Sequence, residues 1–467
     1  MKERIALLII ISFLVAFLII FQNYFNTMWA VIFLIGFMFL YSFYMYCVTK
    51  NQKRKLKKHP PILNYDYHPF VSVLIPCHNE HEVIEKTVEN VLNLDYKDFE
   101  VILIDDRSED DTALIIENLA KKYDKVQALI RKKDSTPGKS AVLNEAMKLA
   151  KGDAILVFDA DAKVEKDFLT KMVIKLEPVD VGAVQAQKVI INAKQNFLTK
   201  CQYNEYILDS HLQVGRDAVR GAVELRGNGE LIKRLALESI NYWNEETIVD
   251  DLDMSTRLHI KGWDIRFCPE AKVYEEGVIT FPALIKQRRR WVEGSIRRYL
   301  EYAWAVFTSK DMSLRVGFDL IAYISEFLLP FWLIAEIVIQ AFHFVKGYEN
   351  CVLSSIILVA TTAIFFTCGF IYSLRKYANY SFGRAFWESI LTSIYFITIW
   401  FPIAMFIIFK IIFTKKTMDW GKTQHGVTDV VLEGKTISFK APFKRVTMTD
   451  AIKEKTGYDI TGQTEEQ

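Results

Sequence analysis

Long runs of uncharged, apolar residues at both ends of the chain restrict its fold more than any other feature. Residues 5–22 and 28–49 carry no charge, and each is long enough for a helix that spans a bilayer. The first run could be a signal peptide, but a second run follows it closely and no small-residue cleavage site separates them. We therefore expect a transmembrane hairpin at the N-terminus.

Three more apolar runs lie near the C-terminus. Residues 352–373 and 389–409 are uncharged, whereas residues 316–345 include three acidic residues, among them Asp319. Ionisable side chains are costly in the bilayer core. We therefore expect part of 316–345 to lie at the membrane surface.

A basic cluster after the first hairpin sets the expected orientation. It holds six Lys or Arg between Lys50 and Lys58, a composition typical of cytosolic segments that contact anionic lipid. Five spans from a cytosolic N-terminus would place the C-terminal tail outside, although the lysines after the last run favour the inside. We expect an even number of spans, with either 316–345 interfacial or 389–409 re-entrant around Pro402.

Composition excludes several classes of protein. The formal net charge of +2 gives no support for nucleic-acid binding. The six cysteines are scattered without a C-x-x-C pair, so neither a zinc site nor a disulfide framework is indicated, and reduced thiols are expected.

The polar body between the apolar ends alternates between strand-like and helix-like patterns from Val71 onward. Buried strands and helical spacing follow one another, an order that predicts a parallel sheet with helices on both faces. The predicted strands are 71–76, 99–106, 126–130 and 154–160, and the predicted helices are 82–94, 112–123 and 138–151.

Polar clusters follow the predicted strands, where ligands bind in sheets of this kind. Pro76–Glu80 follows the first strand, Asp105 and Asp106 end the second, and Asp159 and Asp161 follow the fourth. Two carboxylates so close together repel each other unless a cation lies between them, although an isolated Asp-x-Asp is more often a polar turn. Together with the Gly138-Lys139 turn, these strand ends favour a site for a nucleotide diphosphate and its metal ion.

Six motifs of this body resemble membrane-embedded, inverting glycosyltransferases of family 2, which include cellulose, chitin and hyaluronan synthases and bacterial glycolipid synthases. The resemblance covers about 70–295 and implies an α/β GT-A domain, a Rossmann-like mixed sheet, flanked by transmembrane helices. It also implies a UDP-sugar donor and Mg²⁺ or Mn²⁺. The motifs are VSVLIPCHNE, VILIDDRSEDDT, PGKSAVLNEA, VFDADAKV, TIVDDLDMSTRLHIKGW and QRRRW.

The resemblance also implies roles for residues at the strand ends. Asp159 and Asp161 would bind the metal ion, which neutralises charge on the departing diphosphate. Lys139 would contact phosphate, with a solvated lysine at a helix start as an equal alternative. The uridine pocket would be lined by Pro76, Asn79, Glu80 and Asp106.

In the motif VDDLD, Asp251 aligns with the family's base, which takes the proton from the acceptor hydroxyl. The family has Thr-Glu where this chain has Val249 and Asp250, so the roles of those two positions stay open. Acidic residues that open a helix also complement its dipole, which is the alternative for an isolated pair.

In QRRRW, Arg290 would bind the diphosphate, and Gln287 and Trp291 would contact the acceptor. Alone, this string could be a basic helix on the bilayer. The apolar residues after it mix with Arg297 and Arg298, which predicts an amphipathic helix on the inner leaflet.

The segment 420–426, WGKTQHG, resembles the mobile gating segment of related synthases. That resemblance makes Thr423 and His425 candidate contacts of the donor. A tail at the headgroup boundary, anchored by Trp420, is the rival interpretation.

The motifs are most similar to those of bacterial synthases that place one hexose on diacylglycerol, so we expect inverting transfer of a hexose from a UDP-sugar to that lipid. A processive synthase of poly-N-acetylglucosamine is the alternative, and an inactive scaffold is a third. The expected partners are the UDP-sugar, the lipid acceptor and the membrane, with a flippase or accessory subunit left open.

We expect a multi-pass protein of the cell membrane whose catalytic domain is cytosolic. The expected segments are a hairpin (1–49), a basic linker (50–69), a GT-A domain (70–295), an interfacial segment (296–315), a membrane region (316–413) and a cytosolic tail (414–467).

Overall fold

The computed structural model describes most of the polar body and part of the apolar ends. The described residues are 5, 7–13, 16, 27–58, 67–322, 341, 345, 350–414, 429–432 and 435–438. Thr423, His425, half of the predicted span 5–22 and most of the predicted span 316–345 lie outside them.

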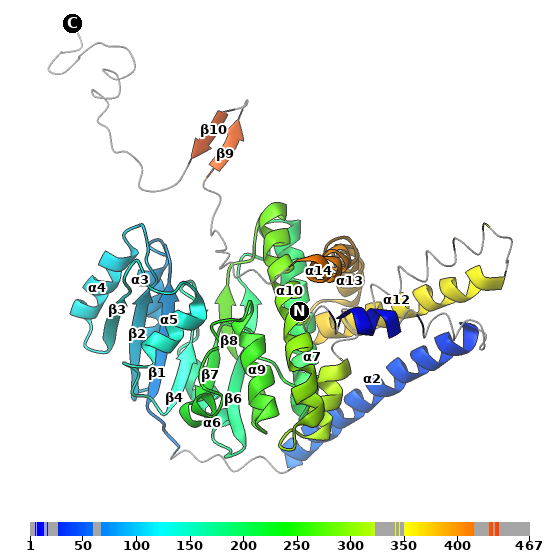
Figure 1. The fold of residues 1–467 in the computed structure, drawn as a ribbon, viewed down its shortest axis with the longest axis horizontal. Coiled ribbons are helices and arrows are strands. Elements are labelled where there is room, and N and C mark those ends of the chain that lie inside the picture. The colour runs from blue at the N-terminus through cyan, green and yellow to red at the C-terminus, as the bar shows by residue number, and fades with distance from the viewer. Residues whose placement is uncertain are drawn as a thin grey trace, which may run out of the picture. The chain divides into compact units, whose positions relative to one another are not determined.

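The polar body is built on an eight-stranded sheet (Figure 1). Its strand order is β3-β2-β1-β4-β7-β6-β8-β5. The strands are β1 (Val71–Cys77), β2 (Phe99–Asp105), β3 (Val126–Ile130), β4 (Ala154–Val157), β5 (Lys163–Val164), β6 (Val181–Ile190), β7 (Glu230–Lys233) and β8 (Asp264–Glu275).

The first half of the sheet follows the sequence prediction, and the second half does not. β1 pairs in parallel with β2 and β4, and β2 with β3. β7 then runs antiparallel to both β4 and β6, so the sheet is mixed. β7 has four residues and begins just after Gly227 and Gly229, whose φ angles are +80° and +71°. A purely parallel sheet is therefore wrong, and the mixed GT-A-like sheet is confirmed.

Helices cover both faces of the sheet because alternate residues of its central strands point to opposite sides. Val73 and Ile75 of β1 lie in one core with α3, α4 and α6, whereas Leu74 lies in a second core with α5, α8 and α9. All seven residues of β1 are buried. The helices are α3 (Ile84–Leu92), α4 (Thr112–Lys122), α5 (Lys139–Ala146), α6 (Phe168–Leu176), α8 (Arg234–Ser239) and α9 (Asp250–Ile260).

Two long helices, α7 (Phe197–Val219) and α10 (Phe281–Thr308), lie between the sheet and the apolar helices (Figure 1). Arg297 and Arg298 of α10 are each 3% exposed, and Arg298 pairs with the buried Glu224 at 2.7 Å. The two arginines therefore lie inside the protein and do not form the polar face of an amphipathic surface helix.

The acidic residue that marked 316–345 as interfacial is also internal. Asp319 is 5% exposed, accepts a hydrogen bond from the Ala222 N–H at 2.8 Å and pairs with Arg216 at 3.5 Å. Its charge is compensated within the protein and gives no information about a membrane surface.

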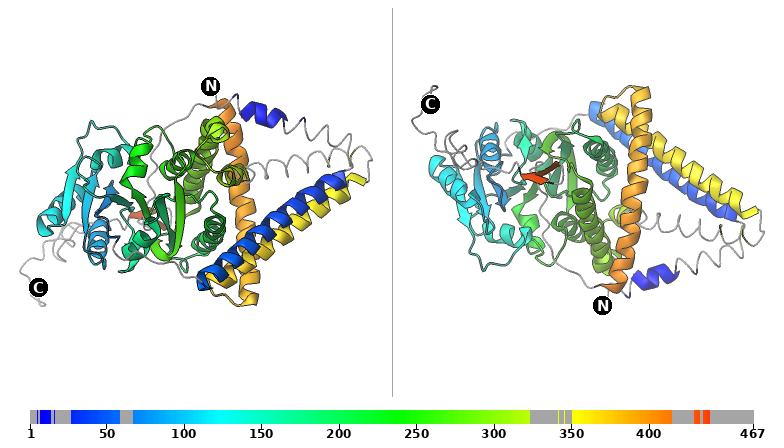
Figure 2. Two further views of the ribbon diagram at one scale, coloured as in Figure 1. Left: turned by 90° about the horizontal axis from the view of Figure 1, so that it is seen from below. Right: turned by 90° about the horizontal axis from the view of Figure 1, so that it is seen from above.

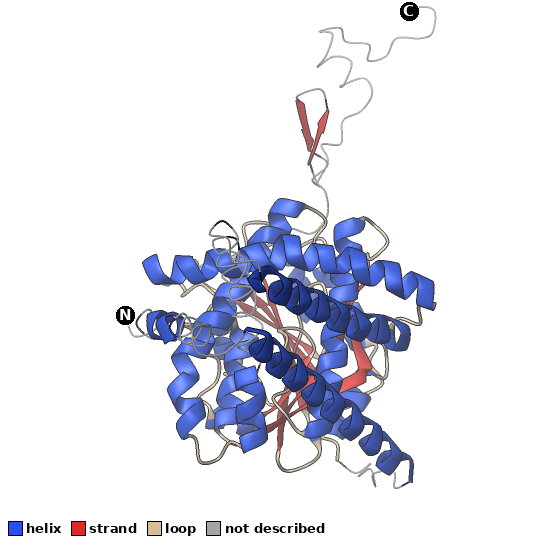
Figure 3. Cartoon of the chain, turned by 90° about the vertical axis from the view of Figure 1, so that its right-hand side faces the viewer, coloured by secondary structure: helices blue, strands red, loops and turns tan. Residues whose placement is uncertain are grey.

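Two long helices in the described parts of the apolar ends, α2 (Thr27–Lys58) and α12 (Asn350–Tyr377), lie side by side (Figure 2). Viewed from their side, α2 and α12 lie in front of the sheet (Figure 3). In the part of the chain that the structure describes, one helix, Phe382–Phe413, is long and apolar enough to cross a membrane. A multi-pass topology stays a prediction.

The helix Phe382–Phe413 consists of α13 (Phe382–Tyr395), the π-helical turn η1 (Phe396–Trp400) and α14 (Phe401–Phe413). The chain stays helical through Pro402, which follows closely on the π-helical turn η1. The alternative in which 389–409 turns back around this proline is therefore wrong.

The residues from Gln424 onward form a separate unit. Its described residues are an antiparallel hairpin of β9 (Asp429–Leu432) and β10 (Lys435–Ser438).

Candidate active site

An ion pair joins the start of α5 to the end of β4. Lys139 Nζ lies 2.7 Å from Asp159 Oδ1 and donates a second hydrogen bond to the Gly227 carbonyl at 2.8 Å. The Lys139 side chain is 16% exposed, so the alternative of a solvated lysine is wrong. Burial disfavours the ammonium, but Asp159 and Asp250 outweigh it and raise the Lys139 pKa above its ordinary value.

Asp159 is correspondingly held as an anion. Burial alone would raise its pKa, but Lys139 and then Lys188 outweigh burial, and the pKa lies below its ordinary value. Arg290 of α10 contributes in the same direction, which places its charge near this carboxylate. The predicted convergence of Lys139, Asp159 and Arg290 is therefore seen in the fold.

Asp251 also lies beside Gly227. A Cβ at Gly227 would lie 3.1 Å from Asp251 Oδ2, so the glycine leaves room for this carboxylate. The positive φ of this residue also favours glycine. Asp251 Oδ1 accepts the N–H of Leu252 at 2.7 Å. Burial, followed by the charge of Asp250, raises the Asp251 pKa to about 6. A carboxylate with this pKa is ionised near neutrality and still accepts a proton readily.

Glu230, the first residue of β7, adds a further carboxyl group behind Gly227. It is 2% exposed and accepts the Gly227 N–H at 2.5 Å. Burial, then Asp251 and Asp250, raises its pKa to about 8, so this group is protonated at neutral pH. The sequence analysis missed Glu230 because a single acid in a short strand carries no motif.

Asp161 lies two residues beyond Asp159, at the same strand end, and is half-buried. Among the described residues, no three His, Cys, Asp or Glu side chains form a group that could hold a metal ion by themselves. Two carboxylates nevertheless suit Mg²⁺ or Mn²⁺, because such ions commonly take one or two protein carboxylates and complete their shell with substrate phosphates and water. The ionised Asp159 fits this requirement, so the donor set can hold such a metal.

The loops after β1 and β2 form a second polar cluster. Asn79 has φ +56° and accepts the Glu109 N–H through Oδ1 at 2.7 Å, while the Glu80 N–H donates to Thr112 Oγ1 at 2.8 Å. Pro76 is buried within β1 and holds the backbone of this loop. These contacts fix Asn79 and Glu80 beside the end of β2, as the sequence predicted.

Asp105 and Asp106 have different environments. The Asp106 side chain is fully buried and pairs with Arg131 at 2.6 Å and Arg107 at 3.0 Å. Within the described residues, the buried Oδ1 of Asp105 has no hydrogen-bond partner. Asp106 is thus occupied by the protein, and Asp105, which was placed at this strand end from the sequence without a role, presents an acceptor that a ligand could use.

The QRRRW motif lies in the first half of α10. Gln287 and Trp291 are half-buried, and both contact Arg288, which is fully buried. The motif is thus part of a helix packed within the protein, and the alternative of a basic helix lying on the bilayer is wrong.

A second buried lysine, Lys188 on β6, also faces the carboxylates. Its Nζ lies 2.9 Å from Glu275 and 3.2 Å from the Arg226 carbonyl, and Glu275 and Asp159 outweigh burial and raise its pKa. Asn228 links the same groups, since its Oδ1 accepts the Asp159 N–H at 3.2 Å. The pattern of β6 gave no signal for Lys188, because its partners come from distant parts of the chain.

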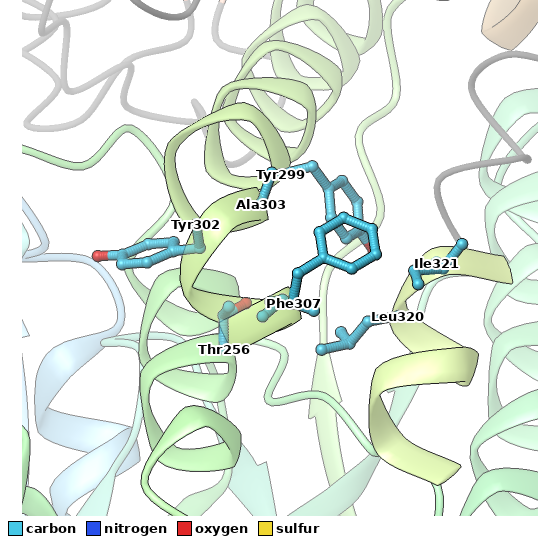
Figure 4. Close-up of a pocket in the computed structure, with 8 residues that line it drawn as sticks. Thr256, Tyr299, Tyr302, Ala303, Phe307, Leu320 and Ile321 are labelled. Atoms are coloured by element: carbon cyan, nitrogen blue, oxygen red, sulfur yellow. The ribbon is translucent and has the colours of Figure 1, made fainter. Parts of the chain in front are cut away.

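An apolar hollow lies elsewhere, between α9, the second half of α10 and the helical residues 314–322 (Figure 4). Its wall includes Tyr302, whose hydroxyl donates to Asp253 Oδ1 at 2.8 Å. Asp253 lies about 200° around α9 from Asp251, since successive helical residues are about 100° apart. The hollow is therefore on the opposite face of α9 from the charged cluster, and we do not place the sugar site there.

The chain was compared with known proteins. The sequence profile described as glycosyltransferase-like family 2 matches residues 68–294. The beta-monoglucosyldiacylglycerol synthase of Synechocystis sp. is 34% identical over 390 residues, which are 80% of each chain. The chain belongs to glycosyltransferase family 2.

Other members of family 2 match shorter stretches. The beta-monoglucosyldiacylglycerol synthase of Trichormus variabilis is 46% identical over 265 residues, and the match spans 56% of either chain. A poly-beta-1,6-N-acetyl-D-glucosamine synthase of Staphylococcus epidermidis is 32% identical over 276 residues, 58% of this chain and 66% of that one. The predicted relationship to both groups of synthases is confirmed.

One solved structure has the same overall fold. The mannosyltransferase PcManGT from Pyrobaculum calidifontis, in complex with GDP-Man and Mn²⁺, superposes with a TM-score of 0.51 at 18% identity. The alignment covers 79% of this chain and 98% of that one. This likeness supports the assignment of the fold.

Gly294 controls how closely α10 approaches the start of α9. A Cβ at this position would overlap Val249 Cγ2 and lie 2.9 Å from Val249 Cβ, and Val249 immediately precedes the acidic start of α9. We expect Gly294→Ala to lower the free energy of unfolding by about 1–3 kcal/mol, as overpacking does elsewhere. A lower thermal midpoint of the purified protein in detergent is the measurement.

Gly383→Ala is the matched control. A Cβ at Gly383, also in a helix, has no atom within 4 Å, so its thermal midpoint should stay the same or rise. Equal thermal midpoints for the two variants would show that the packing of α10 against the start of α9 does not require a glycine at position 294.

Proposed function

We propose that this protein transfers glucose from UDP-glucose, with inversion, to the free hydroxyl of diacylglycerol, and so makes a one-sugar glycolipid. The observation that supports the reaction most strongly is that Asp251 and the Lys139–Asp159 pair both lie beside Gly227. An inverting displacement needs a base on the acceptor side and a charge-stabilised leaving group on the other. The names of the similar synthases support glucose and diacylglycerol.

In this proposal Asp251 is the general base. It takes the proton of the acceptor hydroxyl while that oxygen attacks the anomeric carbon of the donor. The new C–O bond forms as the bond from the anomeric carbon to the diphosphate oxygen breaks, and UDP leaves with the electron pair. The raised pKa of Asp251, about 6, matches this task at neutral pH.

Asp159 and Asp161 would hold Mg²⁺ or Mn²⁺ beside the donor's diphosphate. The ion would supply positive charge where the leaving group develops negative charge. Lys139 and Arg290 would provide the protein's own positive charge at the same end of the site, and Lys139 also orients Asp159 through their 2.7 Å contact. Mn²⁺ in the similarly folded mannosyltransferase makes the metal a reasonable expectation.

Uridine would bind at the loops after β1 and β2, beside Pro76, Asn79 and Glu80. The unpartnered Asp105 Oδ1 suits the imide N–H of uracil, which is a hydrogen-bond donor. Asp106 would support this pocket indirectly, because its own oxygens are held by Arg131 and Arg107. The proposed donor role of Thr423 rests on the sequence alone.

The lipid acceptor would approach along α10, where Gln287 and Trp291 lie. α10 packs against α14, part of the helix Phe382–Phe413 that is able to cross a membrane. That contact supports an acceptor side that lies beside the bilayer, where a diacylglycerol hydroxyl is found. Processive synthesis of poly-N-acetylglucosamine remains the second candidate, supported by the 32% identity to such a synthase.

Asp251→Asn should reduce kcat by at least about 100-fold, because an amide cannot accept the proton. Binding of UDP-glucose, measured by calorimetry, should change little, since the base contacts the acceptor. Asp124→Asn, which removes an exposed carboxylate, is the control and should keep most of the activity. Substantial turnover by Asp251→Asn would remove this residue from its proposed role.

Transfer should require Mg²⁺ or Mn²⁺ and stop in excess EDTA. Asp161→Ala should reproduce the loss, and added Mn²⁺ should restore EDTA-treated wild-type protein. Asp167→Asn, which changes an aspartate whose side chain is 55% exposed, should behave as wild type. Full activity in EDTA would mean that Asp159 and Asp161 form only a polar turn stabilised by Lys139.

The acceptor is tested with membranes that contain the protein and labelled UDP-hexoses supplied one at a time. Label from UDP-glucose should extract into chloroform–methanol and migrate as a lipid with one sugar. Label that stays in ethanol-insoluble, glycosidase-sensitive polymer would instead support the polysaccharide synthase. No label in either fraction, with any donor, would favour an inactive scaffold.

A further inference from the structure

Arg288, the second residue of QRRRW, is the largest side chain that is completely buried in the described part of the protein. Burying a guanidinium is costly, because its lost hydration must be replaced by contacts inside the protein. The resemblance assigns this position no function. Its contacts, however, join the proposed acceptor residues to the helix Phe382–Phe413.

The guanidinium contacts both proposed acceptor residues from within the same helix. Nη1 donates to Gln287 Oε1 at 2.8 Å, and the guanidinium lies 4.2 Å from the centre of the Trp291 ring. Residues three apart in a helix share a face, so Arg288 and Trp291 stack along α10. These contacts restrict the rotamers of Gln287 and Trp291.

The other side of Arg288 faces α7 and the apolar helix. Nη2 donates to Glu205 Oε2 at 2.9 Å, and the Tyr395 hydroxyl donates to the same oxygen at 2.8 Å. The Trp400 ring lies 5.4 Å from the guanidinium. Tyr395 directly precedes the π-helical turn, and Trp400 is the last residue of that turn. Such turns are frequent at functional sites.

We propose that Arg288 is a positioning residue that couples the helix Phe382–Phe413 to the acceptor side of the active site. Its fork holds Gln287 with one nitrogen and Glu205 with the other, so the orientation of the acceptor contacts depends on where Tyr395 and Trp400 lie. A lysine ammonium is a single point charge and lacks the planar fork that reaches Gln287 and Glu205 from two separate nitrogens. This inference rests on the proposed function, because it concerns how the lipid acceptor is held.

The test uses the full-length protein in phosphatidylglycerol vesicles with dioleoylglycerol and UDP-glucose. Arg288→Lys should raise the KM for dioleoylglycerol about tenfold, and Tyr395→Phe about threefold, as expected for lost hydrogen bonds to charged groups. The KM for UDP-glucose should stay within about twofold of wild type, because the donor site is elsewhere. Lys286→Arg, a change at an exposed residue of the same helix, is the control and should leave both KM values unchanged.

The double variant gives a readout that general damage to the fold would not produce. If Tyr395 acts through Glu205 and Arg288, adding Tyr395→Phe to Arg288→Lys should raise the acceptor KM little further, rather than by the product of the two effects. Should Arg288→Lys fail to fold, Tyr395→Phe alone still tests the coupling, since it removes only a hydroxyl.

The outcomes separate the two proposals. Labelled glycolipid from wild type, with an unchanged acceptor KM in Tyr395→Phe or equal effects on both substrates, overturns the coupling alone. No glycolipid from wild type overturns the proposed function, and the coupling with it. A selective, non-additive rise in the acceptor KM supports both.

Discussion

The contact between the Lys139 ammonium and Asp159, at 2.7 Å, is the interaction on which the acidic site depends. Asp159 at the end of β4 and Asp250 and Asp251 of α9 would repel one another without a cation among them. Lys139 supplies that charge from within the protein and also donates to the Gly227 carbonyl at 2.8 Å, next to Asp251. A metal ion would then add to an arrangement that the lysine already stabilises.

The sequence predicted the half of the fold that has a local period. β1 to β4 and the helices between them follow the apolar pattern to within a few residues, because each element buries its own regular face. β7 was not predicted, since its antiparallel pairing with β4 and β6 depends on contacts far apart in the chain. The prediction of the site residues had the same limit. Asp159 and Asp251 lie in motifs, whereas Glu230 and Lys188 are recognised only once distant strands are adjacent.

Burial changed the interpretation of several charged residues. Arg298 and Asp319 are charges that a sequence pattern assigns to a membrane surface, yet both are compensated inside the protein by Glu224 and Arg216. Asp106 is similarly held by Arg131, which leaves the neighbouring Asp105 oxygen for a ligand. Charge in a sequence therefore indicates a site only when the rest of the fold leaves it available. The proposed reaction uses the charges that meet this condition.

The central claim is that Asp251 is a base whose pKa, about 6, is raised by burial and then by the charge of Asp250. Its most direct test is the pH dependence of kcat/KM for the acceptor. The rate should fall as pH drops through about 6, because protonated Asp251 cannot accept the hydroxyl proton. Asp250→Asn removes a like charge and should move this limb to lower pH, whereas Glu246→Gln, at an exposed position nearby, should leave it in place. A rate independent of pH between about 4.5 and 7, or a limb that Asp250→Asn does not move, would contradict the account.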